Sequence, residues 1–323
     1  MLCLLACEGG TLELTRPSNP GSDTPNGQPP PSTDVPGRPG ADTDASDAGA
    51  DTGAGTAAPG AGGDLSGTGP YAVSSDPSLR YAAGGGCQMQ ITRHAPVGAE
   101  DDHIAILSHG FQRNRTNMRN YAQHLASWGV TVYTPTLCSR GFFGSDHTAR
   151  AEDLVNFANA RFNGAPVVYM GYSAGGLSSL LAAANDPNAI GVFGLDLVDS
   201  DNLGRDAASG VSVPVYGLLG GPALCNSQGN GAAVYDRAPT SLAYRLVDAS
   251  HCVFESPSDP ACGIGCFSLS NTFPDDAYRS AVSAFMTGFA RWVTGIEANA
   301  IRVWTQGEPE HQAFRAQGMI VDL

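Results

Sequence analysis

The sequence contains no lysine. All 17 of its basic residues are arginines, set against 31 acidic residues, and the formal net charge is −14. A protein that binds nucleic acid needs a basic patch or stripe that neutralises phosphates. The sequence has no such cluster of basic residues, so we do not expect a nucleic-acid partner.

The segment 8–70 has little of what a folded core requires. From Thr11 to Pro70 the chain consists mostly of Gly, Pro, Ser, Thr, Ala and Asp, with almost no aromatic or branched apolar side chain. Such a segment cannot bury enough apolar surface to offset the conformational entropy lost on folding. We therefore expect residues 8–70 to form a disordered, extended tether.

The first seven residues are short and apolar, and Leu4-Leu5-Ala6-Cys7 resembles a bacterial lipobox. In a lipobox a signal peptidase cuts before a cysteine, which then receives lipid. Because the apolar stretch is short and no basic segment precedes it, we interpret residues 1–7 as a truncated signal, with a plain hydrophobic leader as the alternative. Either interpretation predicts export. The protein would then be a bacterial cell-envelope lipoprotein, attached to the membrane through lipidated Cys7, or a secreted protein.

Six cysteines remain when Cys3 and Cys7 are set aside. An even number fits a disulfide-bonded domain in an oxidising compartment, although six cysteines allow fifteen pairings. A metal site formed by the Cys262-x3-Cys266 pair with His251 and Cys252 is the alternative. The spacing is poor for a metal site and no second cluster accompanies it, so we expect disulfides and no metal. The six residues are Cys87, Cys138, Cys225, Cys252, Cys262 and Cys266.

Short apolar runs alternate with segments of helical spacing from residue 71 to residue 300. This alternation predicts right-handed parallel crossovers and an α/β fold, a doubly wound, mostly parallel sheet flanked by helices. We expect residues 301–323 to be a C-terminal extension. The expected strands are 87–92, 102–107, 130–135, 167–172, 190–198, 213–219 and 242–247, and the expected helices are 116–128, 149–162, 176–184 and 274–293.

The apolar run 167–172 ends in Gly171-Tyr172-Ser173-Ala174-Gly175, and a small-residue, Leu-rich segment follows at once. A strand, a Gly-x-Ser-x-Gly turn and a helix in this order are the context of a nucleophile elbow. The turn forces the serine into strained backbone geometry and exposes its hydroxyl at the carboxyl end of the sheet. We therefore predict that Ser173 is a nucleophile.

A serine hydroxyl needs a base that takes its proton, and the base needs an orienting acid. Beyond Ser173 only two histidines remain. His251 follows the last expected strand, whereas His311 lies in a polar C-terminal stretch, so His251 is the predicted base. A structural histidine beside a disulfide is the alternative.

The acid is harder to choose, because the stretch 218–234 after the strand 213–219 holds no Asp or Glu. The preceding strand ends in Asp196 and Asp199. Asp196, flanked by apolar residues, would be costly to bury unless an imidazole N–H paired with it. We predict Asp196 as the acid, with Asp199 as the runner-up and Asp201 as a solvated loop residue.

Acyl transfer also requires hydrogen-bond donors where negative charge develops on oxygen. The backbone N–H of Ala174, directly after the nucleophile, is one candidate. The loop after the strand 102–107 supplies the other, and we predict the backbone N–H of Phe111. The neighbouring His109 is expected to be structural.

Three segments carry a resemblance to the α/β-hydrolase group that contains the cutinase-like polyester hydrolases and the chlorophyllases. They are Ser108-His109-Gly110-Phe111, Leu125-Ala126-Ser127-Trp128-Gly129-Val130 and Gly171-Tyr172-Ser173-Ala174-Gly175-Gly176. The stretch 194–199 is similar to the Gly-x-Asp-Pro-Val segment of chlorophyllases, whose first Asp is the catalytic acid, and pancreatic-type lipases place their acid at a similar Gly-Leu-Asp. The resemblance covers roughly residues 80 to 295.

The chain departs from these relatives at two places. Leu197 stands where a proline is usual, and Ala174 where chlorophyllases tend to carry arginine. The acid also follows a different strand from that used by the polyester hydrolases. The resemblance therefore implies a general carboxylic ester hydrolase rather than an enzyme for chlorophyll or polyesters.

Together these observations predict an exported, monomeric serine esterase that works through an acyl-enzyme and needs no cofactor. A peptidase or an acyltransferase could use the same three side chains, because a fold does not determine the acceptor. From another class, a surface-tethered binding protein with a degenerate hydrolase domain is the alternative. A complete set of nucleophile, acid and base in the order Ser, Asp, His favours the esterase.

Overall fold

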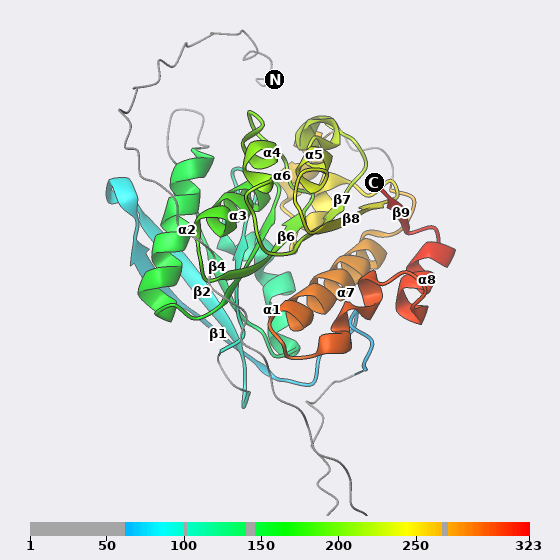
Figure 1. The fold of residues 1–323 in the computed structure, drawn as a ribbon, viewed down its shortest axis with the longest axis horizontal. Helices are drawn as coiled ribbons and strands as arrows, with labels where there is room; N and C mark the ends of the chain where they lie inside the picture. The colour runs from blue at the N-terminus through cyan, green and yellow to red at the C-terminus, as the bar shows by residue number, and fades with distance from the viewer. Residues whose placement is uncertain (1–61, 100–101, 140–145, 267–270) are drawn as a thin grey trace, which may run out of the picture. The chain divides into compact units, whose positions relative to one another are not determined.

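The structure is a computed structural model that describes residues 62–99, 102–139, 146–266 and 271–323. The expected signal segment 1–7, with Cys7, and the tether up to residue 61 lie outside the described residues. The described chain has an α/β fold, with a nine-stranded, mixed but mostly parallel sheet and helices packed on it (Figure 1).

The strands follow each other across the sheet in the order β1-β2-β4-β3-β5-β6-β7-β8-β9. From β4 to β8 all neighbours are parallel, whereas β1, β2 and β9 pair antiparallel at the two edges. The expected strands are present, and β1 and β9 are additional. Their bounds are β1 (Val73–Ala82), β2 (Gln88–Pro96), β3 (Ile104–Ser108), β4 (Thr131–Pro135), β5 (Val167–Tyr172), β6 (Ala189–Leu195), β7 (Val215–Leu219), β8 (Ser241–Leu246) and β9 (Ile320–Asp322).

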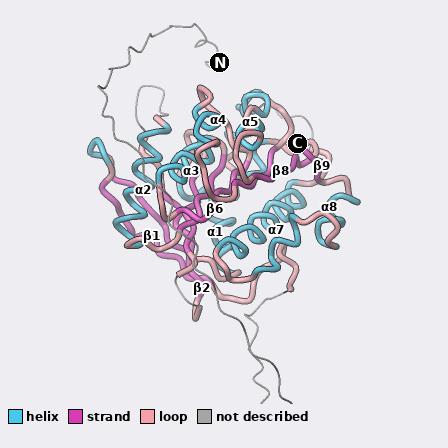
Figure 2. The backbone as a smooth tube through the Cα atoms, viewed as in Figure 1, coloured by secondary structure: helices cyan, strands magenta, loops and turns pink. Residues whose placement is uncertain are grey.

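The tube view separates these strands from the helices that surround them (Figure 2). The α-helices are α1 (Arg119–Ser127), α2 (His147–Phe162), α3 (Ala174–Asn185), α4 (Leu203–Ala208), α5 (Ala232–Tyr235), α6 (Pro260–Cys266), α7 (Asp275–Val293) and α8 (Pro309–Ala316). Short 3₁₀ helices are η1 (Gly84–Gly86), η2 (Arg115–Met118), η3 (Leu224–Gly229), η4 (His251–Phe254) and η5 (Ala298–Trp304).

Strand β5 shows why the sheet has a core on each face. Successive side chains of a strand point to opposite faces. Val168 and Met170 lie in one core with residues of α1 and α7, and Val167 and Tyr169 lie in the other with residues of α2 and α3. A central parallel strand covered on both faces has to be apolar throughout, which explains the unbroken run that ends at the Gly-x-Ser-x-Gly turn.

The packed part of the chain begins before the expected boundary at residue 70. Leu65 is only 4% exposed and belongs to the core that contains α1 and α7. Trp128 Nε1 donates a hydrogen bond to the carbonyl of Gly67, and the Gly69 N–H donates to Ser127 Oγ, both at 2.9 Å. Residues 62–70 thus belong to the folded domain rather than to the tether.

The C-terminal residues 301–323 are also part of this domain and not an appended extension. Trp304 is buried among aromatic side chains, and β9 adds to the edge of the sheet at β8. His311, which lies in a polar stretch of sequence, is fully buried, and its Nδ1 bonds the carbonyl of Val303 at 3.0 Å. The Tyr244 ring of β8, from a distant part of the chain, packs against the His311 ring.

Three disulfides join the six cysteines expected to form them: Cys87–Cys138, Cys225–Cys266 and Cys252–Cys262. Disulfides persist in oxidising compartments, so this set favours an extracytoplasmic location. Among the described residues, no helix combines the length and apolarity needed to cross a membrane.

Candidate active site

Ser173 occupies the sharp turn between β5 and α3, with φ 55° and ψ −123°. A non-glycine residue with positive φ is strained, and such strain is common at functional sites. The two glycines of the motif allow the close packing around it. A Cβ on Gly171 would lie 2.3 Å from the Gly175 carbonyl oxygen, and one on Gly175 would lie 2.3 Å from the His109 carbonyl oxygen. Larger residues would push the turn away from its neighbours.

The three residues predicted as nucleophile, base and acid lie in one hydrogen-bonded line. His251 Nε2 is 3.0 Å from Ser173 Oγ, and His251 Nδ1 is 2.6 Å from Asp196 Oδ2. The carboxylate can only accept, so Nδ1 carries the proton and Nε2 is free to accept the serine hydroxyl. Since β5, β6 and β8 are parallel, the segments that follow them emerge at the same edge of the sheet and bring these residues together.

The alternative acids are held elsewhere. The Asp199 carboxylate accepts hydrogen bonds from the backbone N–H groups of Gly204 and Arg205 at the start of α4, at 2.7 and 3.1 Å. Asp201 is exposed, as expected of a solvated loop residue. Of these acids after β6, Asp196, the one predicted, is the residue that contacts His251.

Asp196 has two further partners that sequence reasoning missed. The backbone N–H of Gly220 donates to Oδ1 at 3.0 Å, and Asn226 Nδ2 donates to Oδ2 at 3.1 Å. Both come from the segment after β7, in which the sequence shows only the absence of an acid. The carboxylate is fully buried, so these donors offset part of the cost of removing it from water.

The loop after β3 lies against the serine. A Cβ on Gly110 would come within 3.2 Å of Ser173 Cβ and 2.8 Å of the Tyr172 ring, so the backbone of this loop directly adjoins Ser173. On the other side, Ala174 is the first residue of α3, and the first N–H groups of a helix have no carbonyl partner within it. Phe111 directly follows Gly110 and Ala174 directly follows Ser173, so both predicted donors belong to segments that meet at this turn, and the Phe111 ring is 45% exposed.

His109 fixes this loop, as expected of a structural residue. Its Nε2 accepts the Leu137 N–H at 2.9 Å, so the proton is on Nδ1, which donates to the Gly110 carbonyl at 2.7 Å. Burial lowers the pKa of His109 to about 4, which keeps the ring neutral near pH 7.

Two contacts around His251 carry no signal in the sequence. The Tyr172 ring packs on the imidazole, with the ring centroids 4.7 Å apart. Four residues after His251, Glu255 is fully buried and accepts a hydrogen bond from Arg113 Nε at 2.8 Å. This ion pair joins the loop after β3, which holds Phe111, to the segment that holds His251.

The sulfur atoms of Cys252, Cys262 and Cys266 lie within 4.8 Å of one another, beside His251. A metal ion would need them as thiolates. Each of them is bonded to another cysteine, so this cluster is two neighbouring disulfides and does not offer a metal site.

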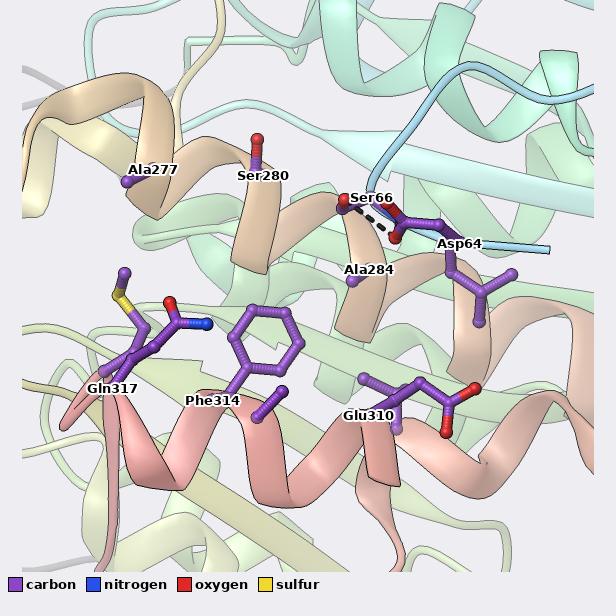
Figure 3. A pocket seen from close by; sticks show the side chains of 12 residues that line it. Asp64, Ser66, Ala277, Ser280, Ala284, Glu310, Phe314 and Gln317 are labelled. Carbon is purple, nitrogen blue, oxygen red and sulfur yellow. Dashed lines mark hydrogen bonds between the residues drawn. The ribbon is translucent and has the colours of Figure 1, made fainter. Parts of the chain in front are cut away.

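A cavity of about 370 Å³ lies between α7 and α8, lined by Asp64, Leu65, Ala284, Phe314 and their neighbours (Figure 3). Phe314 of α8 points toward α7 across this space. None of Ser173, Asp196 and His251 lines it. The cavity is therefore separate from the candidate active site.

Comparison of the chain with protein-family models finds no match, and comparison with curated proteins finds no significant one. The function of the site has to be argued from its residues and their geometry.

Proposed function

We propose that the protein is an α/β-hydrolase that cleaves carboxylic esters through an acyl-enzyme intermediate. The observation that carries the proposal is the continuous hydrogen-bonded line from Asp196 through His251 to Ser173, with distances of 2.6 and 3.0 Å. The strained serine in a strand-turn-helix elbow and the chain order Ser, Asp, His support the same proposal.

In this mechanism Ser173 Oγ attacks the ester carbonyl carbon while His251 Nε2 takes the hydroxyl proton. Asp196 keeps the imidazole in the required tautomer and stabilises the positive charge that it acquires. Negative charge develops on the carbonyl oxygen, and the backbone N–H groups of Phe111 and Ala174 would stabilise it. His251 then gives the proton to the departing alcohol, and water, activated in the same way, hydrolyses the acyl-enzyme.

The chemistry requires no metal or organic cofactor, because the residues supply the nucleophile, the base and the oxyanion donors. We further propose that the domain acts as a monomer outside the cytoplasm, with attachment to a membrane through lipidated Cys7. The three disulfides support the location.

The experiment is covalent labelling of the purified protein with a fluorophosphonate, together with a panel of chromogenic acyl esters. Ser173→Ala should abolish both labelling and hydrolysis while the fold stays intact, because only one oxygen atom is removed. Ser179→Ala is a matched control, since Ser179 is a buried serine of α3 whose hydroxyl bonds the Met170 carbonyl.

Peptide amides and added alcohol acceptors belong in the same panel. Faster cleavage of amides than of esters would indicate a peptidase, and acyl transfer to the alcohol in place of hydrolysis would indicate an acyltransferase. A wild-type protein that neither labels nor turns over any of these compounds would contradict the proposal and favour a degenerate, binding role.

A further inference from the structure

Asn226 lies in the segment after β7, and residues 218 to 234 contain no Asp or Glu. This segment supplies no carboxylate, but it supplies two hydrogen-bond donors to the Asp196 carboxylate. The Gly220 N–H donates to Oδ1 and the Asn226 amide donates to Oδ2. The acid comes from β6, and the neighbouring strand contributes groups that hold it.

The two ends of the Asn226 side chain have separate partners. Its Oδ1 accepts the backbone N–H groups of Ala223 and Gly229, at 2.8 and 3.0 Å, and so organises the short helix η3. Its Nδ2 donates to the Gly221 carbonyl at 2.8 Å and to Asp196 Oδ2 at 3.1 Å. The side chain is fully buried, so water cannot replace either set of bonds.

The surrounding chain fixes Asn226 in place. The preceding residue, Cys225, is bonded to Cys266 of α6. Arg245 of β8 donates to the carbonyl of Gly220, the residue whose N–H meets Asp196. The loop that directs the Asn226 amide at the Asp196 carboxylate is therefore held by a disulfide and by a hydrogen bond from Arg245.

We propose that Asn226 is a positioning residue of the active site, which holds the Asp196 carboxylate in the orientation that His251 requires. This inference rests on the proposed hydrolase function. Asp196 Oδ2 is shared between the Asn226 amide and the His251 imidazole. Without the amide, the carboxylate loses a fixed donor and can rotate away from the ring, which then loses its orientation and its stabilising charge.

Asn226→Asp separates the two ends of the side chain. The new carboxylate keeps an acceptor for Ala223 and Gly229, but it removes the donor and sets a like charge beside Asp196. We expect kcat for a chromogenic ester and the rate of fluorophosphonate labelling to fall by about ten- to a hundredfold, the range for a hydrogen bond to a charged group. KM should stay within about twofold of the wild-type value, because transition-state stabilisation is lost and not substrate binding.

Asn230→Asp is the matched control. Asn230 is an exposed asparagine of the same loop, its side chain bonds the backbone of Asp199, and its substitution makes the same change in charge. Its kcat should stay near the wild-type value. A purely structural role for Asn226 predicts near-wild-type activity for Asn226→Asp, and that result would overturn the proposal. An equal loss of kcat in Asn230→Asp would overturn it as well.

A second measurement does not depend on the folding of Asn226→Asp or on turnover. In the full-length wild-type protein, NMR should show an Asn226 side-chain N–H protected from exchange, and Asp196→Asn should shift its resonance. An unprotected or unshifted resonance would overturn the assignment. If the wild-type protein failed to label with fluorophosphonate while this coupling was present, the proposed function would be wrong, but the contact between Asn226 and Asp196 would stand.

Discussion

His251 Nδ1 and Asp196 Oδ2 are 2.6 Å apart, and the carboxylate reaches this position from a strand-end residue with φ 42°. Positive φ is uncommon for non-glycine residues and costs some backbone strain, although Asp adopts it more readily than most. The strained turn at Asp196 directs the side chain toward the ring, whereas Asp199 turns toward the start of α4. The two acids are close in sequence and have different partners.

This difference predicts unequal effects of two matched substitutions. Asp196→Asn should stabilise the wrong imidazole tautomer, and the equivalent change in a serine protease lowers kcat about 10,000-fold. Asp199→Asn should lower kcat by about tenfold at most, because that residue holds a helix start and meets no catalytic group. Steady-state kinetics on one ester, with thermal unfolding as a check of the fold, measures both. The reverse order would show that Asp199 is the acid, and equal mild losses would direct the search to Asp236 or Asp248.

Much of the fold could be predicted because its central strands are buried on both faces. Their apolar runs and the helical segments between them carry strong patterns, and β3 to β8 were all expected. The edge strand β1 was missed because its side chains are mostly exposed and polar. The short β9 and the packing of Trp304 were missed because their partners are distant in sequence, and local patterns do not encode such contacts.

The candidate site divides in a similar way. Ser173 is recognisable because the elbow imposes a fixed local pattern of glycines. His251 is recognisable because only two histidines follow Ser173 in the sequence. Asp196 could be preferred to Asp199 from its apolar flanks, but only the turn at the strand end settles which carboxylate meets the ring. Asn226 gave no signal, since a buried asparagine in a Gly-rich segment resembles any turn residue.

Leu65 provides a test of the revised start of the domain. Leu65→Ala should lower the free energy of unfolding by about 2–5 kcal/mol, the range for removing a buried leucine side chain. Leu224→Ala, at a position that is 70% exposed, should change it by less than about 0.5 kcal/mol. Chemical denaturation of both variants measures the difference. Equal stabilities would show that residues 62–70 contribute nothing to the core.

A truncation series locates the same boundary. A chain that begins at Gly62 should be as stable as the full-length protein. A chain that begins at Tyr71 should be less stable, because it lacks Leu65 and the bonds that Gly67 and Gly69 make with α1 and Trp128. Full stability of the shorter chain would restore the boundary expected from composition.

Arg113 and Glu255 form the ion pair that joins the two loops beside the site. Arg113 Nε lies 2.8 Å from a Glu255 carboxylate that is fully buried, and burial raises the pKa of Glu255 despite this partner. A carboxyl with a raised pKa binds more protons in the folded state than in the unfolded state. Its contribution to stability is therefore most favourable below the unfolded pKa and declines as the pH rises through the folded pKa.

Removal of Arg113 should increase the loss of stability that Glu255 causes as the pH rises. Arg113→Met leaves the buried Glu255 carboxylate without its arginine partner, so the free energy of unfolding should fall by about 3–5 kcal/mol at pH 7. This deficit should shrink as the pH falls toward 4, because Glu255 then takes up a proton. Glu255→Gln in the Arg113→Met background should remove the pH dependence of this deficit. Arg279→Met is the control, because the carboxylates of Asp275 and Asp276 that it pairs with are exposed, and such pairs contribute about 1 kcal/mol or less. Denaturation of the wild type and the three variants between pH 4 and 8 tests the prediction. A deficit for Arg113→Met that stays constant over this range would mean that the guanidinium acts through packing rather than through the charge of Glu255.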